Sequence, residues 1–134
     1  MSQSVSLSGS TVLVVEDDFY LAEDQREALE AAGATVLGPC PTVAEALALL
    51  RDHEPDCAIL DVSLTDGPSF DLARAIVHRG IPMLFVTGYE ASSIPSDLTG
   101  LVRLQKPVTA PKILAAAAEV RQSGGYGRMF DNER

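Results

Sequence analysis

The side chains best suited to chemistry follow short apolar runs of the sequence, where the chain would leave a buried strand. Three are carboxylates, one is a hydroxyl and one is an ammonium group: Glu16, Asp17, Asp61, Thr87 and Lys106. Carboxylates crowded at one place repel one another, so they favour a bound cation. Oxygen-only ligands are typical of Mg²⁺, and no His or Cys adjoins these residues to indicate zinc.

These residue types together predict phosphoryl chemistry. A carboxylate held beside Mg²⁺ can attack phosphorus and form an aspartyl phosphate. The cation and the ammonium group of Lys106 would neutralise charge on the transferred group, and the hydroxyl of Thr87 would donate to one of its oxygens. Asp and Thr are common at turns and helix caps, so the indication lies in the whole set and its order along the chain.

Five apolar runs predict the buried strands that end at or near these residues. They span residues 11–16, 34–39, 56–61, 82–87 and 101–104. Helices are predicted over residues 17–33, 42–53, 68–80 and 109–122. Asp18 is the candidate N-cap of the first helix, and Thr42 with Glu45 forms a capping box for the second.

This alternation of strands and helices predicts a single α/β domain. The strands are almost continuously apolar, which is typical of a parallel sheet covered by helices on both faces. In such sheets, sites form outside the carboxyl ends of the strands, at the topological switch point. The polar residues named above stand at those ends, so we expect them to meet there.

The folded domain is predicted over residues 11–122. We expect a flexible Ser-rich segment over residues 1–10 and a flexible Gly-rich tail over residues 123–134. Cys40 and Cys57 are too few for a disulfide framework or a zinc site and are interpreted as packing residues.

Composition and charge exclude several classes of protein. The formal net charge of −9 argues against a nucleic-acid binder and against docking to an anionic membrane. No apolar run is long enough to span a membrane, and the N-terminus lacks the features of a signal peptide. A cytoplasmic protein with protein partners is therefore expected, with neither nucleic acid nor membrane among them.

Four short motifs resemble the receiver domain of two-component response regulators. They are LVVED (13–17), ILDVSL (59–64), FVTG (85–88) and LQKP (104–107). The resemblance covers about residues 11–122. It implies a flavodoxin-like, doubly wound five-stranded sheet with strand order 2-1-3-4-5 and helices on both faces.

The resemblance also implies a role for each site residue. Asp61 would accept a phosphoryl group from a histidine kinase or a histidine phosphotransfer protein. Asp61, Asp17 and Glu16 would hold Mg²⁺, with Asp17 as a direct ligand and Glu16 acting largely through water. Lys106 would contact the phosphoryl group, and the bond between Lys106 and Pro107 would be cis.

The predicted switch region departs from the usual family pattern. Thr87 matches the switch hydroxyl, but Arg103 stands where most receivers carry an aromatic residue. The stretch 82–90 resembles the FAT GUY subgroup of receivers, which also lacks that aromatic residue. We therefore expect Tyr89 and the following loop to take over signalling. The segment 88–100 holds Pro95 and predicts a fourth helix that is short or mobile.

Taken together, the sequence predicts a stand-alone phospho-acceptor that signals by protein contact or onward phosphotransfer to an unknown downstream protein. It would not be an enzyme in the usual sense, although self-phosphorylation and autodephosphorylation are expected. Phe19 and Tyr20 adjoin the acidic residues, either as partner contacts or as packing. One alternative is a receiver that binds partners without phosphorylation. Another is a haloacid-dehalogenase-type phosphatase, which requires Asp-x-Asp, whereas Ser63 occupies the second position here.

Overall fold

The computed structural model of the chain describes residues 6–88 and 94–123. The strands are β1 (Thr11–Val15), β2 (Thr35–Cys40), β3 (Cys57–Asp61), β4 (Ser63–Leu64), β5 (Gly67–Pro68), β6 (Met83–Thr87) and β7 (Val102–Gln105). The helices are α1 (Phe19–Ala31), α2 (Val43–Asp52), α3 (Phe70–His78) and α4 (Ala110–Ser123). The five predicted strands and four predicted helices are confirmed, and none of their ends differs by more than two residues.

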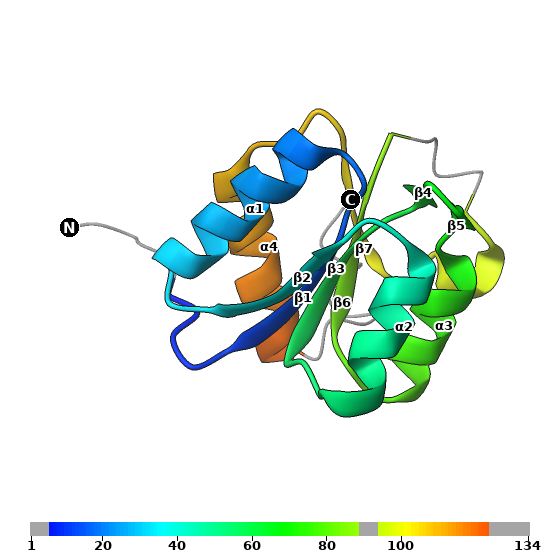
Figure 1. Cartoon of the computed structure of the whole chain (residues 1–134), viewed down its shortest axis with the longest axis horizontal. Coiled ribbons are helices and arrows are strands. Elements are labelled where there is room, and N and C mark those ends of the chain that lie inside the picture. The colour runs from blue at the N-terminus through cyan, green and yellow to red at the C-terminus, as the bar shows by residue number, and fades with distance from the viewer. Residues whose placement is uncertain (1–5, 89–93, 124–134) are drawn as a thin grey trace.

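The main sheet has five parallel strands in the order β2-β1-β3-β6-β7. Counted along the chain without β4 and β5, this is the predicted order 2-1-3-4-5 of the flavodoxin-like fold. Figure 1 shows α1 and α4 on one face of the sheet and α2 and α3 on the other. The doubly wound architecture with helices on both faces is therefore confirmed.

The alternation of side chains along β1 explains the two-sided core. Leu13 and Val15 are buried against α2 and α3, whereas Val12 and Val14 are buried against α1 and α4. Successive side chains of a strand point to opposite faces, so a strand buried on both faces must be apolar throughout. Because both faces of the strands are buried, polar residues are found at the strand ends.

The predicted N-cap residues begin α1 and α2. The side chain of Asp18 accepts a hydrogen bond from Leu21 N at 3.0 Å, and Thr42 Oγ1 accepts one from Glu45 N at 3.1 Å. Each satisfies a backbone N–H that the first turn of a helix leaves without a partner. These caps fix where α1 and α2 begin, next to the ends of β1 and β2.

Residues 6–10, which the sequence assigns to a flexible segment, lie against the domain. Leu7 is fully buried, and its N–H donates to Ala32 O at 2.8 Å. Gly33 adopts a φ of 98°, and a Cβ there would lie 2.6 Å from Ser8 Oγ. Glycine is therefore required where the chain leaves α1 and meets this N-terminal strip.

A small hairpin was not predicted. Strands β4 and β5 form an antiparallel pair between β3 and α3, with Ser63 opposite Pro68. Between β6 and β7, the described residues contain one short 3₁₀-helix, Ser96–Leu98. The mobility expected for the segment 88–100 stays a prediction, since residues 89–93 lie outside the described ranges.

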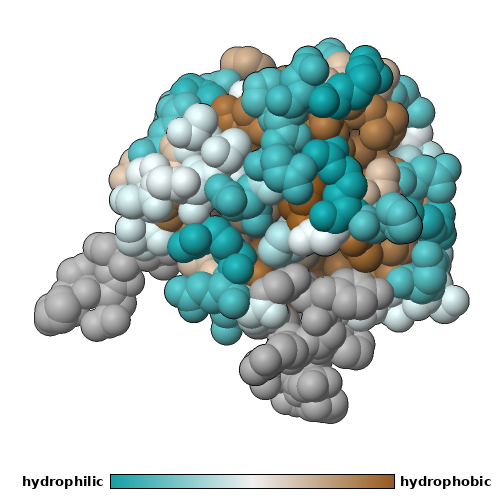
Figure 2. Space-filling view, turned by 90° about the horizontal axis from the view of Figure 1, so that it is seen from below, coloured by the Kyte–Doolittle hydropathy of each residue, from teal (hydrophilic) through white to brown (hydrophobic). Residues whose placement is uncertain are grey.

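Figure 2 shows hydrophilic residues over much of one face, with hydrophobic residues exposed between them. Among the described residues, no helix is both long and apolar enough to cross a membrane. Cys40 and Cys57 are buried free thiols, and burial raises their pKa values to about 11 and about 12. Both thiols thus stay protonated at neutral pH, as expected of packing residues.

Candidate functional site

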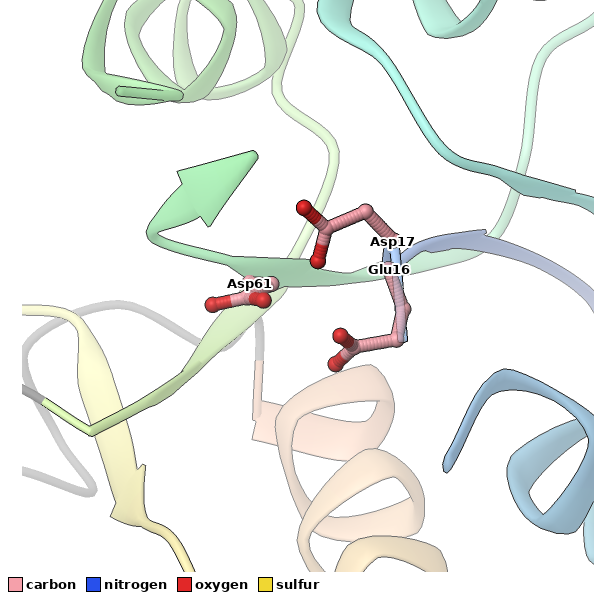
Figure 3. Close-up of side chains that lie close together, drawn as sticks. All are labelled: Glu16, Asp17 and Asp61. Atoms are coloured by element: carbon pink, nitrogen blue, oxygen red, sulfur yellow. The ribbon is translucent and has the colours of Figure 1, made fainter. Parts of the chain in front are cut away.

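Three carboxylates meet where β1 and β3 end. Glu16 and Asp17 follow β1, and Asp61 is the last residue of β3. One oxygen from each carboxylate lies within 4.8 Å of the others. In Figure 3 the side chains of Glu16 and Asp17 both reach toward Asp61. Because β1 and β3 are paired and parallel, their carboxyl ends adjoin, so the predicted cluster forms.

The three carboxylates differ in exposure. Glu16 is 3% exposed and Asp61 is 4% exposed, whereas Asp17 is exposed to solvent. Burial of two like charges side by side is unfavourable unless a cation compensates them. The cluster therefore combines two nearly inaccessible carboxylates with one that opens toward solvent.

Lys106 supplies part of the compensating charge. Its Nζ donates to Asp61 Oδ2 at 3.2 Å and to Glu16 Oε2 at 3.4 Å. The backbone N–H of Lys106 donates to Thr87 O at 2.8 Å, which ties the end of β7 to the end of β6. The bond between Lys106 and Pro107 is cis, as the resemblance implied. These contacts direct the ammonium group to the acidic cluster.

Electrostatics at the cluster favour a further cation. Burial, together with the neighbouring Asp61, raises the pKa of Glu16 to about 7, although Asp18 N–H and Lys106 oppose the shift. Burial lowers the pKa of Lys106, but the two carboxylates outweigh burial and raise it overall. One ammonium group thus serves two buried carboxylates and leaves the cluster short of positive charge.

The donor set fits Mg²⁺. All three groups offer oxygen atoms, which this ion prefers, and it usually keeps several water ligands. Glu16 Oε1 is buried and finds no hydrogen-bond partner within the described part of the chain. A buried acceptor without a partner is rare, and a water ligand of a bound cation would satisfy it. Asp17, Asp61 and Glu16 are therefore the residues that would hold the ion.

Thr87 reaches the same edge of the sheet. It is the last residue of β6, it is 3% exposed, and its strand pairs with the strand of Asp61. Tyr89, the other predicted switch residue, lies outside the described residues. Arg103 on β7 pairs with Phe85, and its Nη1 donates to Thr99 O at 2.9 Å.

Sequence reasoning missed the side chains that hold the loop after β3. Ser63 N donates to Asp61 Oδ1 at 3.1 Å, and Ser69 Oγ donates to Asp61 O at 2.7 Å. Thr65 Oγ1 donates to Asp17 Oδ2 at 3.2 Å. The turn-rich composition of this stretch was the available signal, since Ser, Thr and Asp side chains often bond nearby backbone.

A pocket of about 220 Å³ adjoins the cluster on the side of α1. It is lined by Glu16, Asp17, Phe19, Ala22, Glu23, Pro39 and Pro41. The rings of Phe19 and Tyr20 meet edge to face, and these residues are 68% and 79% exposed. Of the two alternatives for Phe19 and Tyr20, this exposure contradicts packing, and partner contact stays a prediction. The two residues form an exposed aromatic pair beside the acidic residues.

Comparisons with known proteins agree on one family. A family model of the response regulator receiver domain matches residues 12–118. The acid tolerance regulatory protein ActR of Rhizobium meliloti is 34% identical over 111 residues, which cover 79% of this chain and 57% of ActR. The chain thus spans little more than half of that relative's length.

Solved structures give the same result. The solution structure of SdrG from Sphingomonas melonis is 36% identical with a TM-score of 0.72, over 90% of this chain and 99% of that one. A CheY-like receiver domain from Methanospirillum hungatei has a TM-score of 0.76 at 24% identity, over 86% of this chain and 95% of that one, and it supports the fold.

Proposed function

This chain belongs to the response regulator receiver family, and from that premise we propose that it accepts a phosphoryl group on Asp61 in a Mg²⁺-dependent reaction. One observation carries the proposal. The carboxylate of Asp61 lies with those of Glu16 and Asp17 in one cluster and 3.2 Å from the Lys106 ammonium group. This arrangement supplies a nucleophile, a place for a divalent cation and a fixed positive charge.

In the proposed step, a carboxylate oxygen of Asp61 attacks the phosphorus of a phosphohistidine on a histidine kinase or a histidine phosphotransfer protein. The new P–O bond forms as the P–N bond breaks, and the released imidazole takes a proton from solvent. Lys106 neutralises charge on the phosphoryl oxygens, and the Thr87 hydroxyl donates to one of them. Glu16, Asp17 and Asp61 would hold Mg²⁺, which would supply positive charge to stabilise the transferred group.

Hydrolysis of the aspartyl phosphate would return the chain to its resting state. We therefore propose a signalling domain with self-phosphorylation and autodephosphorylation rather than an enzyme for a separate substrate. The buried free thiols are in keeping with a cytoplasmic setting.

Partner recognition is proposed to use the exposed pair Phe19 and Tyr20 beside the site. Exposed aromatic residues next to a reaction centre are typical of contact surfaces. A kinase or phosphotransfer protein would dock there, and a downstream protein would be engaged by direct contact or onward phosphotransfer.

We propose that the switch is of the FAT GUY type. Arg103 occupies the position on β7 where most receivers carry an aromatic residue, and its side chain donates to Thr99 O. A rotating aromatic ring therefore cannot act as the switch at this position. Thr87 would sense the phosphoryl group, and Tyr89 would pass on the change.

The test is intact-mass spectrometry after incubation with acetyl phosphate, with and without Mg²⁺. The wild type should gain one phosphoryl group only with Mg²⁺, and Asp61→Asn should gain none. Asp24→Asn is the matched control, because Asp24 is an exposed carboxylate on α1 outside the cluster. A wild type that gains nothing from acetyl phosphate or from any phosphorylated histidine donor would instead favour a receiver that binds partners without phosphorylation.

A further inference from the structure

The hairpin of β4 and β5 is anchored at its base to Asp61. Ser69 is fully buried, its N–H donates to Val62 O at 2.8 Å, and its Oγ donates to Asp61 O at 2.7 Å. Ser63 N adds a bond to Asp61 Oδ1. The path of the chain from residue 62 to residue 69 is thus fixed relative to the proposed acceptor, and the hairpin projects from it as a unit.

The tip of the hairpin touches two further places. Thr65 Oγ1 donates to Asp17 Oδ2, which belongs to the proposed cation site. The next residue, Asp66, accepts from Val43 N at 2.9 Å and from Ala44 N at 3.3 Å, in the first turn of α2. Figure 1 shows β4 and β5 near α2 and α3 at the same end of the molecule.

Asp66 acts as a remote cap of α2. The first turn of a helix leaves backbone N–H groups without intrahelical partners and carries partial positive charge. Thr42 satisfies the N–H of Glu45, and Asp66, 22 and 23 residues further along the chain, satisfies those of Ala44 and Val43. The position of the hairpin tip therefore affects the start of α2.

We propose that Thr65 is a positioning residue for Asp17 and that the hairpin transmits cation binding to the N-terminus of α2. This inference rests on the proposed function, because it assumes that Asp17 binds the cation. A carboxylate can bind a metal through one oxygen while the other accepts a hydrogen bond. Partners that orient metal-binding carboxylates in this way commonly change metal affinity 10–100-fold when removed.

Asp17 needs such a partner more than the other two carboxylates do. Glu16 and Asp61 are buried and held by Lys106, whereas Asp17 is exposed and free to rotate unless something orients it. Thr65 supplies that hydrogen bond from the same hairpin that caps α2. If Asp17 moves when it binds a cation, Thr65 should move with it. The next residue, Asp66, caps α2, so the start of α2 should also change.

The test is a titration of the full chain with MgCl₂, followed by the NMR amide signals of each residue. In the wild type, the signals of Val43 and Ala44 should shift with the same midpoint as those around Asp17. Thr65→Val keeps the side-chain shape and removes the hydroxyl. It should weaken Mg²⁺ binding about tenfold and abolish the shifts at Val43 and Ala44.

Three further variants make the result specific. Thr65→Ser restores a hydroxyl and should restore both the affinity and the remote shifts. Asp66→Ala should leave Mg²⁺ affinity within about twofold of the wild type while removing the Mg²⁺-dependent shifts at Val43 and Ala44. Thr35→Val, on an exposed position of β2, is the matched control and should behave like the wild type.

Two results would overturn this inference while leaving the proposed function intact. One is unchanged Mg²⁺ affinity in Thr65→Val when the wild type binds Mg²⁺, and the other is weakened affinity that Thr65→Ser does not restore. Absence of Mg²⁺ binding by the wild type is a different outcome. It would overturn the proposed function, and this inference with it.

Discussion

Lys106 and Arg74 each lie between two carboxylates, and their two clusters differ in almost every other respect. At the site, Lys106 lies 3.4 Å from Glu16 and 3.2 Å from Asp61, whose side chains are 1% and 5% exposed. At the corner of α3 and the 3₁₀-helix, Arg74 lies 2.8 Å from both Asp71 and Asp97, whose side chains are 96% and 57% exposed. The shorter contacts thus belong to the exposed cluster.

The difference separates a surface contact between two elements from a buried contact that suits the proposed reaction. Arg74 makes a two-pronged contact with Asp97 and links α3 to the 3₁₀-helix in water, where such pairs contribute little to stability. Glu16 and Asp61 are buried around one shared ammonium group, and Glu16 Oε1 lacks a partner among the described residues. Buried charge left undercompensated is unfavourable for folding but suits the binding of a cation and a phosphoryl group.

The largest effect should follow removal of the buried cation. Lys106→Met keeps much of the side-chain length and deletes the charge that would stabilise the transferred group. We expect the rate of phosphorylation by acetyl phosphate to fall about 10²–10³-fold, the range typical for loss of one stabilising donor. Single-turnover kinetics by intact mass at saturating Mg²⁺ would measure the rate.

Arg74→Met is the matched control for that experiment, since it removes the cation of the exposed cluster and should leave the rate unchanged. Equal losses in the two variants would contradict the comparison. Such losses would mean that Lys106 and Arg74 both act only by keeping the chain folded. Thermal melts of the two variants would reveal this.

The site residues that could be predicted from the sequence were predictable for one physical reason. Glu16, Asp61, Thr87 and Lys106 follow apolar strands, and parallel pairing alone brings such ends together. The hairpin of β4 and β5 could not be predicted in this way, because strands of two residues carry no measurable alternation.

Contacts between positions far apart in the sequence could not be predicted either. The bond from Arg74 to Asp97 joins residues 23 positions apart, and the cap from Asp66 to Val43 does the same. Surface Arg and Asp residues are numerous, and no local pattern says which of them will meet. Leu7 also escaped prediction, because isolated apolar residues in a Ser-rich stretch give no periodic signal.

An intermediate effect is expected when pH changes the charge of Glu16. Its pKa is about 7 in the folded chain and near 4.5 in an unfolded one, so the folded state binds more protons between these values. The free energy of unfolding without Mg²⁺ should therefore fall as pH rises from about 5 to 8, by on the order of 1–3 kcal/mol. Urea unfolding in Mg²⁺-free buffer at several pH values would measure this.

Glu16→Gln sharpens this prediction, because the variant cannot ionise at that position. It should flatten the pH profile, raise stability at pH 8 and weaken Mg²⁺ binding. Glu23 and Asp97 do not interfere, since lowered pKa values make their contributions change only below about pH 4.5. The raised pKa of Lys106 keeps it charged throughout. A variant with the wild-type pH slope would show that another group titrates.

The smallest effect should come from the exposed cluster. Asp97→Asn removes the charge that Arg74 holds between α3 and the 3₁₀-helix while keeping the side-chain shape. Because the pair is exposed, we expect a fall in Tm smaller than the change caused by Glu16→Gln. The fall in Tm caused by Asp97→Asn should vanish in about 1 M NaCl, where charges are screened within a few ångströms. Asp71→Asn is the matched control. Phosphorylation should be unchanged, so a defect like that of Lys106→Met would assign this corner a part in the reaction.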